Sequence, residues 1–394
     1  MESIELTDKR RICVAIVTDF PQNPDDPYGG VQAVSIHLVR GLSELNGLDI
    51  HVVTEDPGCS KPEQTQWGKI LIHRLPRKSR YTLINAIGPA RRQMISYLQK
   101  LAPDVVHAHD VYGLMVQGLS IPRVFTIHGQ IYKDTRVSGG CFPRMRSVLW
   151  KYIEQNGWAK QPHVISISPY VREQLTGIVK GTIHNIDNPI GEEYFKLERK
   201  EEPARIFCAA AICPRKNTLM LVKSFARLLE SGINAQLRLS GGGESKYIDL
   251  VYHFIHEQGL DKNVKLLGRV SYETIQDEMA HASVFILVSL EENSPMGIEE
   301  AMAAGVPVVT SNRCGMPYMV RDGESGFLVD PENPDNIARG LMKLLENDEL
   351  RTSFGAKGKE IAMDRFHPAK VAARTREVYL HAISEFHSKR QNPN

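Results

Sequence analysis

The sequence predicts an α/β protein of two domains, each a doubly wound parallel sheet covered by helices, which face each other across a central cleft. Three observations lead to this prediction. The chain has 394 residues, enough for two cores of ordinary size. Short apolar runs alternate with stretches whose apolar residues recur at helical spacing, as in βαβ units. A polar, charged stretch near residues 189–203 divides this alternation into two series.

The first series predicts an N-terminal domain over residues 1–190. It opens with an apolar run at 11–19, a Gly pair, and then apolar residues at helical spacing, which is the order strand, loop, helix. The same order repeats, with further strands predicted at 49–56, 69–76, 104–110, 122–129 and 163–168 and helices in stretches such as 81–101 and 170–178.

The second series predicts a C-terminal domain over residues 191–370. Its strands are predicted at 205–212, 235–243, 263–270, 283–290, 306–311 and 325–331. A helical stretch at 374–386 follows the last strand, so residues 371–394 are set apart as a C-terminal helix. This helix either closes the second domain or reaches back across the first.

Ligand binding is expected in the loops that follow the predicted strands. In open parallel sheets the carboxyl ends of the strands, the Gly loops and the helix N-termini gather at one edge, and ligands bind there. Two domains of similar size would place two such edges on either side of a cleft.

The composition is that of a folded, water-soluble protein, with 42% hydrophobic and 24% charged residues. Charges interrupt the N-terminal residues where a secretory signal would be apolar, and no run of about 18 apolar residues occurs. We therefore expect a cytoplasmic protein. The six cysteines form no CxxC pair and no His cluster stands at metal-ligand spacing, so reduced thiols are favoured over a metal site: Cys13, Cys59, Cys141, Cys208, Cys213 and Cys314.

The charge is uneven along the chain although its net value is only +2. Residues 61–160 contain 16 Lys and Arg against 5 Asp and Glu. This basic segment suits an anionic acceptor or contact with the inner face of an anionic membrane, and a plain solvated surface is the alternative. Aromatic residues are not interleaved with the basic ones as in single-strand binders, so no nucleic acid is expected as a partner.

Residues 289–311, SLEENSPMGIEEAMAAGVPVVTS, contain two carboxylates eight positions apart. We read Ser294 as the helix N-cap, Pro295 as the first helical residue and Gly305 as the stop, which puts Glu292 in the loop and Glu300 in the helix.

The start of this helix suits phosphate or clustered hydroxyls. The N–H groups of Met296, Gly297 and Ile298 are uncapped at the positive end of the helix dipole, and Gly297 would let a ligand come close. The carboxylates of Glu292 and Glu300 would accept hydrogen bonds from sugar hydroxyls. An ordinary acidic first helical turn explains the same residues without a ligand.

Arg215 and Lys216 precede a helix that begins near residue 217 or 218, and cations there oppose the helix dipole, which favours a bound diphosphate. Gly29 and Gly30 precede the first helix without a GxGxxG pattern, so they fit either a close approach to phosphate or a plain turn. His128 ends one strand, and His107 and His109 lie in another; such residues are either structural or face the cleft. The patterns of a serine nucleophile elbow, a Walker A loop and a zinc protease are absent from the sequence.

These segments together resemble family 4 of the retaining GT-B glycosyltransferases. Glu292 to Glu300 resembles the EX7E motif of that family, and EAMAAGVPVV resembles the run that follows it. Further similarity lies in PRKN at 214–217, SGGGE at 240–244, CGMPYMVRDGESGFLVDP at 314–331, and in YGGVQ, DVVHAHD, FTIHG and SISPYVRE of the first half.

The resemblance implies two Rossmann-like domains, a nucleotide-sugar donor bound mainly by the second, a saccharide or lipid-linked acceptor on the first, and neither metal nor redox cofactor. It implies that Glu292 contacts the transferred sugar and Glu300 the ribose, with His128 near the reacting carbon. Lys216 would bind the diphosphate, and Gly30 would approach it from the first domain. Backbone groups of Met296 and Gly297 would bind the sugar or phosphate, and Arg269 would lie near the base.

One position departs from the family. The family often has an arginine five residues before the lysine that corresponds to Lys216, and this chain has Ala211 there. Two explanations are open: Arg215 replaces the missing cation, or the phosphates of the donor are bound more weakly. The expected activity is transfer of a hexose from UDP or GDP, with retention, to a hydroxyl of a glycan, lipid-linked saccharide or small molecule. The alternatives are a catalytically weak nucleotide-sugar-binding protein, or a phosphorylase or epimerase on the same fold.

Overall fold

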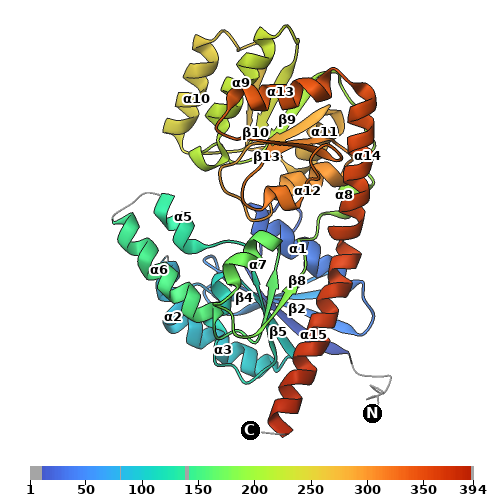
Figure 1. Cartoon of the computed structure of the whole chain (residues 1–394). Helices are drawn as coiled ribbons and strands as arrows, with labels where there is room; N and C mark the ends of the chain where they lie inside the picture. The colour runs from blue at the N-terminus through green and yellow to red at the C-terminus, as the bar shows by residue number, and fades with distance from the viewer. Residues whose placement is uncertain (1–10, 80, 138–141, 392–394) are drawn as a thin grey trace.

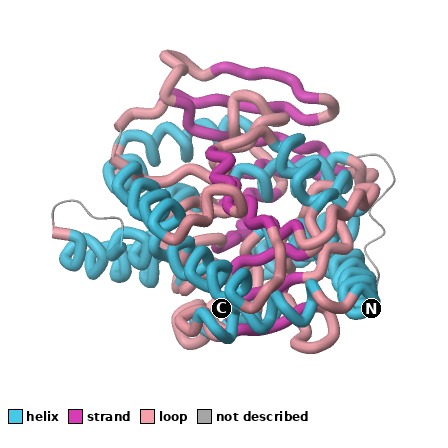
Figure 2. Tube along the Cα trace, turned by 90° about the horizontal axis from the view of Figure 1, so that it is seen from above, coloured by secondary structure: helices cyan, strands magenta, loops and turns pink. Residues whose placement is uncertain are grey.

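The computed structural model describes residues 11–79, 81–137 and 142–391. Figure 1 shows two domains stacked one above the other, and Figure 2 shows strands as a central band with helices on both sides. Both domains are α/β, which confirms the predicted fold class. Within the described ranges no helix combines the length and the apolar character needed to cross a bilayer.

The first domain contains an eight-stranded sheet in the order β3-β4-β2-β1-β5-β6-β7-β8. Its strands are β1 Ile12–Val17, β2 Leu48–Asp56, β3 Glu63–Trp67, β4 Ile70–Pro76, β5 Val105–His109, β6 Arg123–Ile127, β7 His163–Ser166 and β8 Thr182–Asn185. Its helices are α1 Gly30–Ser43, α2 Thr82–Ile87, α3 Pro89–Leu101, α4 Val111–Met115, α5 Ile131–Val137, α6 Pro143–Trp158 and α7 Pro169–Leu175.

The structure differs from the sequence prediction at both edges of this sheet. β3 and β8 were not predicted, because their exposed or half-exposed residues lack a continuous apolar run. β3 pairs antiparallel with β4, whereas every other ladder in this sheet is parallel. The single helix expected over 81–101 is two helices, because Gly88 breaks it and Pro89 begins the second.

The second domain contains a six-stranded parallel sheet in the order β11-β10-β9-β12-β13-β14. Its strands are β9 Arg205–Ala209, β10 Gln236–Ser240, β11 Val264–Gly268, β12 Val284–Leu287, β13 Val308–Ser311 and β14 Gly326–Val329. Its helices are α8 Glu192–Phe195, α9 Thr218–Glu230, α10 Ser245–Glu257, α11 Tyr272–His281, α12 Met296–Ala303, α13 Pro334–Leu345 and α14 Asp348–Arg365, with short 3₁₀ turns at Pro214–Lys216 and Met316–Tyr318.

The long helix α15, Pro368–Gln391, returns from the second domain and packs on the first sheet (Figure 1). Val371, Val378 and Tyr379 are buried in the same core as residues of β1, β2 and β5. The fully buried His107 bonds through Nδ1 to the Tyr379 hydroxyl at 2.7 Å and through Nε2 to Thr126 at 2.7 Å. His107 is therefore a structural residue that ties α15 to the sheet.

Tyr379→Phe removes the buried partner of His107 Nδ1 and leaves that nitrogen unpaired, which costs about 1–3 kcal/mol. We expect this loss in the free energy of unfolding, measured by urea denaturation. Tyr152→Phe, at a position 69% exposed, is the control and should leave stability unchanged. Equal stability of Tyr379→Phe and the wild type would show that the hydroxyl does not support His107.

Candidate functional site

The carboxyl ends of the two sheets meet at the loop that follows β12. The Asn293 side chain donates through Nδ2 to the backbone carbonyl of His128, after β6, at 2.8 Å. The backbone carbonyl of Asn293 accepts a hydrogen bond from the Ser168 hydroxyl, after β7, at 2.8 Å. One residue of the second domain is thus bonded to two strand ends of the first.

Other side chains also join the domains around this point. Lys133 pairs with Glu291 at 2.6 Å between nitrogen and oxygen, and the Tyr318 hydroxyl donates to Glu173 at 3.0 Å. The Arg269 guanidinium lies 4.0 Å from the ring centroid of Tyr28, a residue that is 71% exposed. Arg269 therefore lies at the margin of the interface, where it stacks on the residue before the Gly pair.

Two cations converge on Glu292 in the loop between β12 and α12. Its Oε1 lies 2.6 Å from Lys216 Nζ and 2.7 Å from Arg215 Nη1, and Arg215 also donates to the Glu291 carbonyl at 2.9 Å. The Glu292 side chain is only 10% exposed and that of Lys216 only 15%. Shielding from water strengthens such pairs, so these three groups form a compact polar site with a net positive charge.

α12 begins one residue later than the sequence predicted. Pro295 has extended backbone angles and is the N-cap, with Met296 as the first helical residue. The Ser294 hydroxyl does not cap the helix, because it donates to Glu299 Oε1 at 2.5 Å. No side chain caps α12, but the N–H of Ile298 bonds to the Pro295 carbonyl at 3.1 Å, so only the N–H groups of Met296 and Gly297 remain candidates for a ligand. The predicted stop is confirmed: Gly305 has φ of 73° and the N–H of Val306 bonds to the carbonyl of Ala301.

The reason for a glycine at 297 is also different from the prediction. A Cβ there would meet Phe285 Cζ at 2.9 Å and the Ala209 carbonyl oxygen at 3.3 Å. The missing side chain therefore allows close packing of α12 on β9 and β12, and the close approach of a ligand stays a prediction.

The Gly pair of the first domain faces the start of α12. Gly29 is the N-cap of α1, with φ of 93° that favours glycine, and no side chain caps α1. A Cβ on Gly30 would lie 3.7 Å from the Met296 sulfur. The start of α9 likewise has no side-chain cap, because Asn217 bonds instead to the carbonyls of Val288 and Pro331.

Glu300 lies apart from the Glu292 group, in the body of α12. It is 7% exposed, and burial raises its pKa to about 7, with Glu193 adding to the rise and a hydrogen bond from Tyr194 opposing it. The carboxyl group also contributes to raising the pKa of Tyr272, whose hydroxyl reaches His37 of α1 at 3.3 Å. Glu300 therefore changes charge near neutral pH within a buried cluster at the domain interface.

His128 is held at the end of β6 by Asp110. The Asp110 carboxylate accepts from the backbone N–H groups of His128 at 2.8 Å and Gly129 at 3.2 Å. Asp110 has φ of 44°, an unfavourable angle for a residue other than glycine, in a position that fixes this loop. Burial lowers the pKa of His128, so its imidazole is neutral, and its Nε2 bonds to His109 at 3.2 Å.

Sequence reasoning missed Asn293 and Ser168, which join the domains, and Asp110, which holds the His128 loop within the first domain. Asn293 lies inside the 289–311 segment, but its polar role depends on partners 125 and 165 residues away. Ala211 is exposed beside β9, and Arg215 rather than a residue at 211 reaches the Glu292 group.

Glu300→Gln should stabilise the protein above pH 4.5, with the gain growing until about pH 7. The folded pKa of Glu300 is about 7 against an ordinary 4.5, so its stabilising, protonated form is complete below pH 4.5 and is lost as the pH rises through 7. The variant should therefore match the wild type near pH 4.5 and exceed it at pH 8. The gain is a few kcal/mol at most, because a tenfold change in an acid dissociation constant corresponds to roughly 1.4 kcal/mol.

Melting curves between pH 4.5 and 8.5 measure this difference. Glu257→Gln, at an exposed position at the end of α10, controls for the loss of one negative charge. A constant offset between Glu300→Gln and wild type across this range would contradict the assignment.

Comparisons with known proteins agree with this architecture. An uncharacterised glycosyltransferase of Methanocaldococcus jannaschii is 24% identical over 362 residues, covering 90% of this chain and 96% of its own. The MMP alpha-(1→4)-mannosyltransferase of Mycolicibacterium hassiacum is 28% identical over 300 residues, 71% of each chain.

Solved structures show the same fold. Sucrose-phosphate synthase of Thermosynechococcus elongatus superposes with a TM-score of 0.79 at 19% identity, covering 95% of this chain and 100% of that one. Anabaena HepE, in complex with UDP and glucose, gives a TM-score of 0.67 at 16% identity, covering 93% and 98%.

The two halves of the chain match two family models. Residues 28–193 match the model Glycosyltransferase Family 4, and residues 190–361 match Glycosyl transferases group 1. The matches adjoin between the two sheets and together run from residue 28 to residue 361, so the chain belongs to the group 1 glycosyltransferases, with the GT-B fold.

Proposed function

We propose that the protein transfers a hexose, with retention of anomeric configuration, from a UDP- or GDP-linked sugar to a hydroxyl of a saccharide or lipid-linked acceptor. The observation that carries the proposal is the group formed by Glu292, Lys216 and Arg215 beside the uncapped start of α12. A mannosyltransferase among the relatives and the UDP and glucose bound by HepE support a nucleotide-sugar donor.

The diphosphate of the donor is the group that this site suits best. As the bond from sugar to diphosphate breaks, negative charge grows on the leaving oxygen. Lys216, Arg215 and the N–H groups at the start of α12 would stabilise that charge without reorganising. Arg215 would supply the second cation in place of the arginine that Ala211 replaces, and no metal ion is required in this scheme.

Glu292 is unsuited to attack the sugar as a nucleophile. Its Oε1 is engaged by two cations at 2.6 and 2.7 Å, which draw charge from the attacking oxygen. We therefore favour attack from the face of the leaving group, with the diphosphate accepting the proton of the acceptor hydroxyl. Glu292 would then bind hydroxyls of the transferred sugar, Glu300 the ribose, and the neutral His128 a hydroxyl near the reacting carbon.

The contribution of Lys216 is tested by Lys216→Ala. Loss of one fixed group that stabilises developing charge typically lowers kcat about 100- to 1000-fold, and we expect a loss of this size. The measurement is release of nucleoside diphosphate from UDP-glucose and GDP-mannose with a panel of saccharide acceptors. Lys262→Ala, at an exposed lysine before β11, is the control.

The outcomes separate the proposal from its alternatives. Turnover by Lys216→Ala within a few-fold of wild type would remove this residue from the mechanism. Binding of donor to wild type without transfer to any acceptor would indicate a nucleotide-sugar-binding protein, and dependence on inorganic phosphate would indicate a phosphorylase.

The surface of α6 favours an acceptor that lies in a membrane. Met145, Val148 and Tyr152 repeat along one face of the helix at 67%, 70% and 69% exposure, and Phe142 precedes them. Arg144, Arg146 and Lys151 are exposed on the same helix. An apolar stripe flanked by cations suits an anionic lipid surface, into which the stripe inserts while the cations remain at the headgroups.

Met145→Ser combined with Val148→Ser should reduce binding to vesicles of phosphatidylglycerol and phosphatidylcholine by about tenfold or more, because each buried apolar side chain contributes about 1.5–3 kcal/mol. Cosedimentation measures the bound fraction. Leu250→Ser with Tyr252→Ser on α10 is the matched pair, since both positions are exposed and apolar in the other domain. Equal loss in the two double variants would refute membrane contact through α6.

A further inference from the structure

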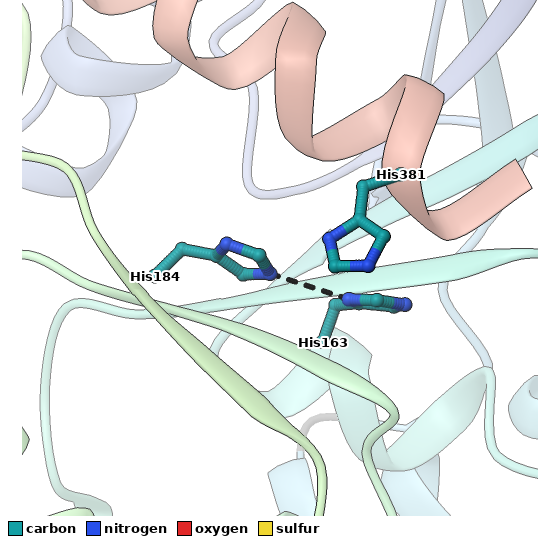
Figure 3. Close-up of side chains that lie close together, drawn as sticks. All are labelled: His163, His184 and His381. Atoms are coloured by element: carbon teal, nitrogen blue, oxygen red, sulfur yellow. Dashed lines mark hydrogen bonds between the residues drawn. The ribbon is translucent and has the colours of Figure 1, made fainter. Parts of the chain in front are cut away.

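Three histidines gather where α15 crosses the edge of the first sheet. His163 is the first residue of β7, His184 lies in the edge strand β8, and His381 projects from α15 (Figure 3). Because His163 pairs with Thr182 in the parallel ladder, His163 and His184 stand on the same face of the sheet, two positions apart in register. His163 begins β7, and His184 is the third of the four residues of β8.

The spacing of the ring nitrogens is that of a metal site. His163 Nδ1 and His184 Nε2 are hydrogen-bonded at 3.2 Å, a contact that an ion between them would replace, and one nitrogen from each of the three rings lies within 4.8 Å of the others (Figure 3). Zinc binds imidazole nitrogen at about 2.0–2.1 Å with tetrahedral geometry, which places two ligand nitrogens about 3.3 Å apart. The His381 ring packs edge-on against the rings of His163 and His184, and its side chain is 53% exposed, so solvent reaches this side of the group.

A carboxylate stands behind the central ring. Glu385 Oε2 lies 3.3 Å from His163 Nε2, the nitrogen opposite the one that faces His184. In metal sites the ring nitrogen that does not bind the ion usually donates to a carboxylate, which fixes the tautomer and orients the ring. Glu385 follows His381 by one helical turn, so α15 contributes both a ligand and this second partner.

Imidazole binds metals in its neutral form. Burial lowers the pKa of His163 and, together with the neighbouring rings, lowers that of His184 to about 4. The charged groups that face them are Glu385, which opposes the shift, and Lys389, which pairs with Glu385.

We propose that His163, His184 and His381 bind a divalent transition-metal ion of the zinc class, with Glu385 orienting His163. Three imidazoles leave a fourth position, which the exposed side of the group opens to water. The ion would join an edge strand to α15 and so fasten the returning helix to the first domain. This role is structural and independent of the sugar-transfer reaction.

A second group of potential ligands, Cys13, Asp49 and His51, is less suited to a metal. His51 Nδ1 bonds to His73 Nε2 at 2.9 Å, and His73 bonds in turn to the Tyr97 hydroxyl at 2.8 Å. The His51 ring is thus bonded to a group outside its cluster, whereas His163 Nδ1 is bonded to another proposed ligand. Because this group contains the Cys13 thiol, Co²⁺ bound there would have a different absorption spectrum from Co²⁺ bound by the three histidines.

The test uses the full chain without a histidine tag, stripped with a chelator and titrated with CoCl₂ and ZnCl₂. We expect one equivalent of Co²⁺ to give the visible bands of a nitrogen and oxygen site, without the near-ultraviolet band of a cobalt thiolate, and Zn²⁺ to displace it. His381→Ala should weaken Zn²⁺ affinity at least 100-fold, and Glu385→Gln should weaken it about 10- to 100-fold, as outer-shell substitutions do.

Controls separate this site from other binding and from misfolding. His387→Ala removes an exposed histidine from the same helix and should bind Zn²⁺ as the wild type does. Zn²⁺ should raise the melting temperature of the wild type and of His387→Ala, and leave that of His381→Ala unchanged. The substituted position is exposed, so the variant is expected to fold.

Three results would overturn the proposal: a thiolate band on Co²⁺ binding, Zn²⁺ affinity within threefold of wild type in His381→Ala, or absence of stoichiometric binding by the wild type. Sugar transfer measured with and without chelator, well below the melting temperature, should be equal. A dependence of transfer on metal would place the ion in the reaction and contradict a purely structural role.

Discussion

The structure depends on holding the carboxyl ends of two parallel sheets against each other. Parallel strands deliver their loops and the starts of their helices to one edge, so each domain alone presents only half of a binding surface. Asn293 joins the halves with an amide that binds the backbone after β6 and a carbonyl that accepts from Ser168 after β7. Lys133, Arg269 and Tyr318 add contacts around it. These contacts bring the first domain against the loop that carries Glu292, whose side chain is only 10% exposed.

The two acids of the 289–311 segment differ although they lie in one motif. Glu292 meets two cations, which compensate its charge. Glu300 is buried beside Tyr194 and within the influence of Glu193, and no cation among the described groups that act on it lowers its pKa. Seven residues of loop and helix thus separate a carboxylate paired with two cations from one whose ionisation is costly. A ligand hydroxyl that reached Glu300 would favour its ionised form by donating to it.

The sequence predicted the elements that carry strong periodic or apolar patterns, and it failed where structure depends on distant partners. Buried strands such as β1 and β12 follow from their apolar runs. β3 and β8 were missed because edge strands need no such run. Ser294 was read as a cap because its type and position fit, but a buried carboxylate competes for its hydroxyl. Gly297 was assigned to a ligand, although the constraint comes from Phe285 of β12. No spacing rule would join His163, His184 and His381, since only the return of α15 brings them together.

The path of α15 sets an order of events during synthesis. Residues 368–391 cover one face of the first sheet, yet the ribosome makes them after the whole second domain. At about 5–20 residues per second, roughly 10 to 40 s pass between synthesis of the last strand of the first sheet and synthesis of the end of α15, which packs on that sheet. During this interval the nascent domain exposes apolar surface around β1 and β5 that the finished protein conceals. The second domain, whose core draws on residues 190–366, is complete before then. The half of the molecule that is translated first is therefore the half that matures last.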